Sequence, residues 1–129
     1  MATCAMLIVP TAWLMFAAAP AVADWVKVLE TDIVDQYVDP ATIHRDGDLR
    51  KAWRLQNLKS PTPDGQQSLR LLSEYDCKGG RMRILLGSSY TGPMATGQSL
   101  FLGAGVESEW DRVPPDSMGE LVLKYVCSQ

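Results

Sequence analysis

The chain of 129 residues divides into an uncharged N-terminal segment and a charged remainder. Residues 1–23 contain 19 apolar residues and no Asp, Glu, Lys or Arg, so all 12 basic and 15 acidic side chains follow residue 23. The remainder, residues 24–129, has room for one ordinary domain and is too polar to be embedded in a membrane. A formal net charge of −3 and a pI near 5.0 argue against duplex binding, because neutralising phosphates requires a basic face.

The N-terminal segment has the pattern of a secretory signal peptide. An apolar run over residues 5–19 leads to small residues at Ala21 and Ala23, which match the small-x-small rule of signal peptidase. We therefore expect residues 1–23 to be cleaved, leaving a mature chain that begins at Asp24 in the periplasm or outside the cell without stable membrane insertion. The alternative is an uncleaved anchor, because about 20 apolar residues can span a bilayer. No cysteine follows the expected cleavage site, so no lipoprotein attachment is expected.

The cysteines fit an exported protein. Cleavage would remove Cys4 and leave Cys77 and Cys127, an even number in an oxidising compartment. A bridge between them would close a loop of about 50 residues, worth about 4 kcal/mol in the loop-entropy description. Free or metal-binding thiols are the alternative, but two distant cysteines without a CxxC motif do not make a zinc site.

After residue 24 the pattern is one of short extended segments separated by turn residues. The expected strands cover residues 25–30, 33–39, 49–58, 68–77, 81–90 and 99–110. An Asp-Gly pair at 46–47 predicts a hairpin turn, and residues 59–67 and 91–97 are expected to form loops. Gly103 and Gly105 predict a bulge or bend in the last strand. Short connections throughout imply antiparallel neighbours.

The C-terminal residues change to a helical period. Ser117 and Glu120 have the spacing of a capping box, so we expect a helix of about ten residues that ends near Cys127, with Glu120 reaching back to the cap. The apolar stripe of this helix would pack on the sheet, and a bridge to Cys77 would tether its end. The predicted fold class is α+β: a single antiparallel sheet of about six strands with a disulfide-tethered C-terminal helix packed on it.

Five arginines alternate along the expected strands and form a possible binding face. These are Arg50, Arg54, Arg70, Arg81 and Arg83. Trp53 and Trp110 are large amphipathic residues of the kind enriched at binding hot spots. The alternative is that both tryptophans belong to the core and that the arginines form a solvated face paired with Glu74 and Asp76.

The residues that could support catalysis or bind a metal lack the further side chains that such a site requires. His44 is the only histidine and stands in an expected turn, and Asp46 with Asp48 lacks the further ligands of a calcium loop. Two pairs of carboxylates are spaced for glycoside chemistry, Glu74–Asp76 and Glu107–Glu109. Such pairs are ordinary on an exposed strand face, so we expect no catalytic residue, no metal site and no cofactor.

A series of short motifs along the mature chain resembles the surface-adhesin protein E family of small exported proteins from Gram-negative bacteria. The residues that carry the likeness are, in chain order, Trp25, Tyr37, Asp39, Pro40, Ile43, Arg45, Trp53, Tyr75, Asp76, Cys77, Arg81, Arg83, Trp110, Val113, Pro114, Ser117 and Cys127. The likeness covers nearly all of residues 25–127. It rests on the order and spacing of these motifs, because each motif alone is weak.

The resemblance implies a roughly six-stranded antiparallel sheet with a disulfide-tethered helix. It also implies a non-enzymatic protein that adheres to host matrix or serum proteins such as vitronectin and laminin. The chain departs from the family in lacking a lipoprotein cysteine and in its acidic balance. One alternative is a periplasmic inhibitor or envelope-stress factor that acts on an enzyme through loop 59–67 or 91–97. A small secreted hydrolase that uses the acidic pairs is the other.

Overall fold

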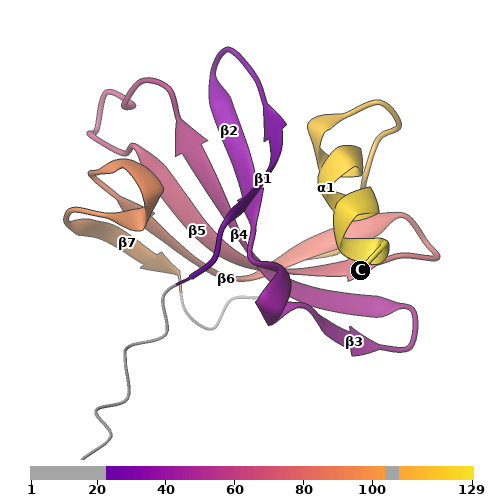
Figure 1. Cartoon of the computed structure of the whole chain (residues 1–129). Helices are drawn as coiled ribbons and strands as arrows, with labels where there is room; N and C mark the ends of the chain where they lie inside the picture. The colour runs from indigo at the N-terminus through magenta and orange to yellow at the C-terminus, as the bar shows by residue number, and fades with distance from the viewer. Residues whose placement is uncertain (1–22, 104–107) are drawn as a thin grey trace, which may run out of the picture.

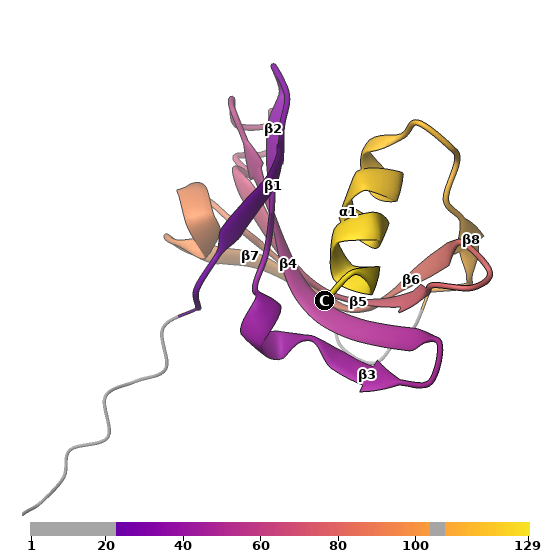
Figure 2. The same cartoon turned by 45° about the vertical axis from the view of Figure 1, so that its right-hand side comes forward.

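The computed structural model describes residues 23–103 and 108–129, which form one antiparallel sheet with a helix packed on one face (Figures 1 and 2). The strands are β1 (Val26–Glu30), β2 (Val34–Val38), β3 (His44–Asp46), β4 (Leu49–Leu58), β5 (Ser68–Asp76), β6 (Arg81–Tyr90), β7 (Ser99–Gly103) and β8 (Asp111–Arg112). The helices are the 3-10 turns η1 (Pro40–Thr42) and η2 (Pro93–Ala95) and the α-helix α1 (Met118–Cys127). The predicted α+β class is confirmed.

The strand order is β1-β2-β4-β5-β6-β7, with β3 beside β4 and β8 beside β6. β2 and β3 share one side of β4, because β2 pairs with the second half of β4 and β3 with its first three residues. The Asp-Gly turn is confirmed between β3 and β4, where Gly47 has a φ of 57° that glycine adopts without strain. The segment around residue 44, which the sequence predicts to be a turn, also contains the short strand β3.

The prediction of one final strand over residues 99–110 is wrong. β7 ends at Gly103, opposite Gly87 of β6, and β8 pairs with the other end of β6. The chain reaches that end through Ser108, whose N–H donates to the carbonyl of Ile84 at 2.9 Å. Gly105 lies outside the described residues, so the bend predicted there stays a prediction.

A bulge bends the centre of the sheet around the helix. Leu72 pairs with Leu86, whereas the next residue of β5, Ser73, pairs with Ile84, so Leu85 is an extra residue in β6. An unpaired residue of this kind increases the local bend and twist of a strand. Figure 2 shows the long central strands curving beneath α1.

Helix α1 begins at the residue that its sequence predicts. Ser117 Oγ accepts a hydrogen bond from the Glu120 N–H at 3.2 Å, which satisfies one of the free amide groups of the first turn. The Glu120 carboxylate does not reach back to the cap as expected, because it pairs with Lys124 one turn later at 2.8 Å. This ion pair raises the pKa of Lys124.

Within the described residues, no helix is long and apolar enough to cross a membrane.

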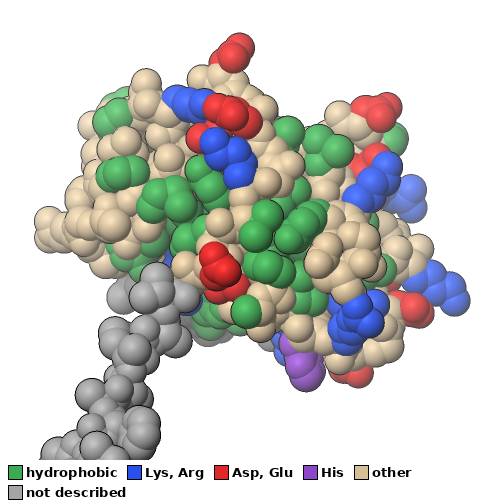
Figure 3. Space-filling view, in the orientation of Figure 1, with side chains coloured by type: hydrophobic (Ala, Val, Ile, Leu, Met, Phe, Trp, Pro, Cys, Tyr) green, Lys and Arg blue, Asp and Glu red, His purple; other side chains and the backbone are tan. Residues whose placement is uncertain are grey.

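The edge strand β1 carries charged side chains that pair with its neighbours. Lys59 Nζ lies 2.8 Å from Glu30 Oε1 and 3.3 Å from Asp35 Oδ1, and Lys27 Nζ lies 3.7 Å from Asp35 Oδ2. Figure 3 shows basic and acidic side chains interleaved over the β1–β2 hairpin. Charged side chains on an edge strand discourage the addition of a further strand from another chain.

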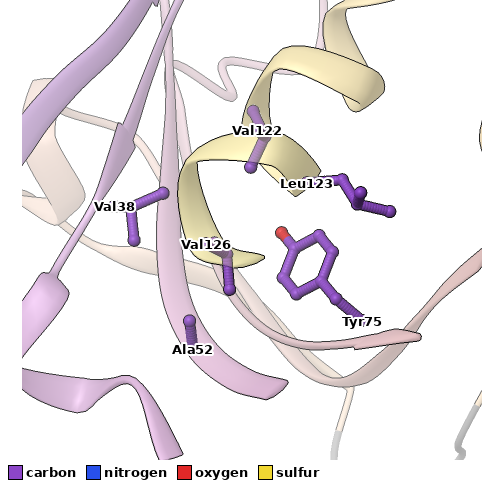
Figure 4. Packing of buried hydrophobic residues seen from close by; sticks show 6 residues of the cluster. All are labelled: Val38, Ala52, Tyr75, Val122, Leu123 and Val126. Carbon is purple, nitrogen blue, oxygen red and sulfur yellow. The ribbon is translucent and has the colours of Figure 1, made fainter. Parts of the chain in front are cut away.

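The core lies between α1 and the sheet (Figure 4). Its buried members are Val38, Ala52, Tyr75, Val122, Leu123 and Val126. A disulfide between Cys77 and Cys127, with Cα atoms 5.8 Å apart, fixes the end of α1 beside the end of β5. The predicted tether is therefore confirmed, and α1 closes one face of the sheet, whereas the opposite face carries no α-helix among the described residues.

Candidate binding face

The strand register assigns each side chain to a face of the sheet, because directly paired residues of antiparallel strands point to the same side. Tyr75 packs against α1, so its strand neighbours Glu74 and Asp76 point away from the helix. We call the side chains gathered on that opposite side the Trp–Arg face. Its residues are Lys51, Trp53, Arg70, Leu72, Glu74, Asp76, Arg81, Arg83 and Trp110.

Four rows of paired residues cross this face. The first row is Leu55–Arg70–Ser88, the second is Trp53–Leu72–Leu86, the third is His44–Lys51–Glu74–Arg83 and the fourth is Leu49–Asp76–Arg81. Residues two apart along a strand are about 6.6 Å apart, so the rows repeat at that interval. A cationic row, an apolar row and two ion-paired rows therefore lie in succession.

Trp53 and Arg70 form the closest cation–π pair of the described residues. The guanidinium carbon of Arg70 lies 3.9 Å from the centroid of the Trp53 ring. Both side chains are half-buried. The guanidinium therefore lies over the indole ring, as cation–π attraction between Arg and Trp favours.

Trp110 stands beside two arginines at the other end of the face. The guanidinium carbons of Arg83 and Arg81 lie 4.6 Å and 5.2 Å from its ring centroid. Arg83 also donates from Nε to Glu74 Oε1 at 2.8 Å, and Arg81 donates from Nη2 to Asp76 Oδ2 at 2.8 Å. The two arginines are thus neutralised by carboxylates of their own row while they flank the indole.

At this end of the face, the contacts of Asp76 stabilise its charged form. The backbone N–H of Gly79 donates to Asp76 Oδ1 at 2.8 Å, and Arg81 binds the other oxygen. The amide hydrogen bond, followed by the arginine, lowers the pKa of Asp76. The carboxylate therefore stays charged and fixes both the turn after β5 and the position of Arg81.

The loop after β6 closes the remaining part of this side of the sheet. The Met94 N–H donates to Asn57 Oδ1 at 2.9 Å, and the Ala95 N–H donates to Ser68 Oγ at 2.9 Å. Ser68 Oγ in turn donates to the Gly92 carbonyl at 2.7 Å. The loop over residues 91–97 is held against the sheet by these bonds and does not protrude.

The five predicted arginines do not share one face. Arg70, Arg81 and Arg83 lie on the Trp–Arg face, whereas Arg50 pairs with Tyr75 and Arg54 with Leu71 on the helix face. The reason is the register between β4 and β5, which places even-numbered residues of β4 opposite odd-numbered residues of β5.

The two arginines of the helix face have structural contacts. Arg54 is 8% exposed and donates from Nε to Ser73 Oγ at 2.8 Å. Arg50 donates from Nη1 to the carbonyls of Gly47 at 2.7 Å and Leu49 at 3.0 Å, which fastens the β3–β4 hairpin. Neither side chain belongs to the Trp–Arg face.

The residues considered for catalysis are in ion pairs or on the surface. Glu74 is buried, and its oxygens contact Arg83 at 2.6 Å and Lys51 at 3.9 Å. His44 and Glu109 are exposed, and Glu107 lies outside the described residues. Among residues 23–103 and 108–129, no group of three His, Cys, Asp or Glu side chains is placed to hold a metal ion.

A groove of about 940 Å³ lies along β5, β6 and β7. Leu69, Leu71 and Ile84 line it from the helix face, with Leu100 on β7 and Asp64 from the β4–β5 loop. The lining is mainly apolar, and Asp64 is its one charged member among the described residues. The groove therefore offers apolar burial, and it shares Leu86 and Ser88 with the rows of the Trp–Arg face.

Sequence patterns missed two members of the third row. Lys51 belongs to it through Glu74, and His44 is placed beside Lys51 by the pairing of β3 with β4. The short strand β3 carries no apolar alternation, so only its position after η1 and before the Asp-Gly turn could have indicated it.

A bent antiparallel sheet, closed on one side by a disulfide-tethered C-terminal α-helix, defines a small α+β domain whose other face is left uncovered by that helix. The chain belongs to the surface-adhesin protein E family, whose family model matches residues 25–128. No curated protein matches the chain.

Solved structures of Haemophilus influenzae protein E have the same fold. Crystal form II of that protein is 15% identical, with a TM-score of 0.62 over 86% of this chain and 94% of that chain. Its selenomethionine form is 14% identical, with a TM-score of 0.62 over 84% and 88%. Protein E from non-typeable Haemophilus influenzae is 13% identical, with a TM-score of 0.58 over 86% and 80%. At these identities the likeness is one of fold.

Proposed function

We propose that the chain is an exported, non-enzymatic envelope protein that binds a protein partner through the Trp–Arg face, as an adhesin does. Membership of the surface-adhesin protein E family supports this function. The observation that carries the proposal is the flanking of Trp53 and Trp110 by arginines on the side of the sheet that α1 leaves free. Trp and Arg are the residues most enriched among binding hot spots.

Export is the first part of the proposal to test. The full chain is expressed in a Gram-negative host, the cells are fractionated, and the N-terminus of the product is determined by mass spectrometry. We expect a product that begins at Asp24 and is found in the periplasm or the medium. Cleavage there leaves β1 intact, because that strand begins at Val26. A product that keeps residues 1–23 in the membrane fraction would contradict cleavage and support an anchor.

Partner binding is tested with the processed product on immobilised vitronectin and laminin. We expect Trp110→Ala to lower the binding by roughly tenfold, as truncation of a hot-spot aromatic residue does. Leu121→Ala is the matched control, because Leu121 is an exposed apolar residue on α1, 48% exposed. Circular dichroism verifies that both variants fold. Equal binding of the two variants and the wild type would place the partner on another surface.

An inhibitor that acts through a loop is the second candidate function. The β4–β5 loop lies at an end of the sheet away from α1 (Figure 1), and a hydrogen bond from the Thr62 N–H to the Gln66 carbonyl at 2.8 Å closes it on itself. A preformed protruding loop is suited to enter an enzyme cleft. Under this proposal, a pull-down recovers an envelope enzyme, and replacing residues 61–65 with Gly and Ser abolishes that capture while Trp110→Ala does not.

A further inference from the structure

Arg70 differs from the other arginines of the Trp–Arg face in making no ion pair with any carboxylate that the structure describes. Arg81 and Arg83 each pair with a carboxylate of their own row, at 2.8 Å and 2.6 Å. Arg70 shares its row with Leu55 and Ser88, and in the described part of the chain it makes no ion pair. Glu74, the next carboxylate of β5 on this face, is four residues away, or about 13 Å along the strand.

The contact with Trp53 prepares the Arg70 guanidinium for an external anion. At 3.9 Å from the centroid, the ring covers one face of the guanidinium. The N–H groups of a guanidinium point outward in its own plane, so stacking leaves its edges able to donate two parallel hydrogen bonds to a carboxylate. Because the indole already restrains the side chain, less conformational entropy is lost when an anion binds.

The neighbouring row indicates what accompanies the anion. Leu72 and Leu86 lie one row from Arg70, and Leu86 is 36% exposed. The separation of the rows, about 6.6 Å, equals the spacing of residues i and i+2 in an extended peptide. A carboxylate side chain on Arg70 would therefore place the side chain two residues further along the peptide over these leucines.

We propose that Arg70, stacked on Trp53, binds the carboxylate of an extended acidic segment of a protein partner, with an apolar residue two positions away on Leu72 and Leu86. This inference rests on the proposed partner-binding function and names the chemistry of the partner. Charge complementarity supports it, since Arg70 is a half-buried cation that makes no ion pair among the residues that the structure describes. The expected motif in the partner is Asp or Glu, any residue, then an aliphatic or aromatic residue.

Two synthetic peptides test the recognition directly. The first peptide repeats the sequence Glu-Thr-Leu-Thr, and the second repeats the sequence Gln-Thr-Leu-Thr. Each is titrated into the isotope-labelled processed protein while the Arg70 Nε–H and Trp53 indole N–H signals are followed by NMR. We expect the acidic peptide to shift both signals and to bind about tenfold more tightly than its twin.

Lysine variants distinguish bidentate recognition by the planar guanidinium group from attraction by a positive charge alone. Arg70→Lys keeps the charge but loses the bidentate geometry, so we expect about a fivefold loss of affinity for the acidic peptide. Arg45→Lys is the control, since Arg45 is exposed and pairs with Arg50 on the helix face, and the affinity of this variant should stay within about twofold of the wild type. Equal losses in the two variants, or equal binding of the two peptides, would overturn the inference. So would a heparin fragment that shifts Arg70 where the acidic peptide does not.

The same variants distinguish failure of the inference from failure of the proposed function. If vitronectin or laminin binds the wild type and Arg70→Lys equally well, partner binding stands and the role of Arg70 is refuted. If neither protein is bound but the peptides are still discriminated at Arg70, the carboxylate site stands and the proposed adhesin function fails.

Discussion

Cys77 and Cys127 are bonded to each other, and this bond joins the residue that follows β5 to the last residue of α1. The sulfur atoms connect positions 50 residues apart, so the bridge restricts a large part of the unfolded chain. The buried face of α1 is formed by Val122, Leu123 and Val126, a small apolar set for a helix of ten residues. The covalent bond and this apolar contact together hold the helix on the sheet, because a helix of that length is not stable by itself.

Replacing both cysteines with serine should lower the free energy of unfolding by about 4 kcal/mol, the loop-entropy value for a closed loop of this size. The measurement is urea unfolding, with hydrogen exchange of the α1 amides as a local readout. Dithiothreitol should destabilise the wild type by the same amount and leave the double variant unchanged. An unchanged melting temperature in the double variant would show that the bridge does not stabilise the domain.

Tyr75 places a hydroxyl in the buried space between the sheet and α1 (Figure 4). The residue is 0% exposed, and its Oη makes no hydrogen bond of good geometry in the described structure. Burial raises the pKa of Tyr75, although the charge of Arg54 and the hydroxyl of Ser73 oppose the rise. The phenol is therefore kept neutral and contributes to stability chiefly through its ring.

Tyr75→Phe should change the free energy of unfolding by less than about 1 kcal/mol, or raise it, since no good hydrogen bond is lost and a desolvation cost disappears. Tyr75→Ala should cost about 3–5 kcal/mol, because it leaves a cavity beneath α1. Both values come from urea unfolding with the disulfide intact. A loss above about 2 kcal/mol in Tyr75→Phe would mean that the hydroxyl is hydrogen-bonded in the folded protein.

Local sequence patterns predicted the strands, turns and helix of this fold better than they predicted the register between the strands. The cap at Ser117 and the Asp-Gly turn are each decided by a few neighbouring residues, and both are confirmed. The face of Arg54 relative to Arg70 depends instead on the register of β4 against β5, which no local pattern specifies. A slip of one residue would move every side chain of a strand to the other face.

Only those features of the candidate site that depend on a single strand could be predicted from the sequence. Because side chains alternate along a strand, the sequence of β5 alone is enough to put Arg70, Glu74 and Asp76 on the side opposite Tyr75. The stacking of Arg70 on Trp53 and the position of Trp110 beside Arg83 depend on contacts between strands. The extra residue Leu85 also reverses the alternation of β6, so a strict two-residue period assigns the second half of that strand to the wrong face.

The loop after β6 is fastened by one buried hydroxyl. Ser68 is 0% exposed, and Met94 and Ala95 beside it have φ values of 54° and 59°, a conformation that costs non-glycine residues about 1 kcal/mol or more. Ser68→Ala should therefore lower stability by about 1–3 kcal/mol and speed hydrogen exchange at Ala95. Ser60→Ala, at an exposed position, is the control and should have no effect. Unchanged exchange at Ala95 would show that other contacts hold the loop.

Asp76 makes the Trp–Arg face sensitive to acid. Its pKa in the folded protein is lowered, first by the Gly79 N–H and then by Arg81, whereas the unfolded chain has the ordinary value of about 3.9. The stability it contributes is therefore fully present above that ordinary value and is lost as the pH falls through the lower folded value. An NMR titration of the carboxyl carbon should give a pKa below the ordinary one, and Arg81→Gln should raise it part of the way, since the amide hydrogen bond remains. Asp76→Asn should make unfolding less dependent on pH below the ordinary pKa of an aspartate. A titration at or above the ordinary value would mean that the contacts of Asp76 with Gly79 and Arg81 are not formed in solution.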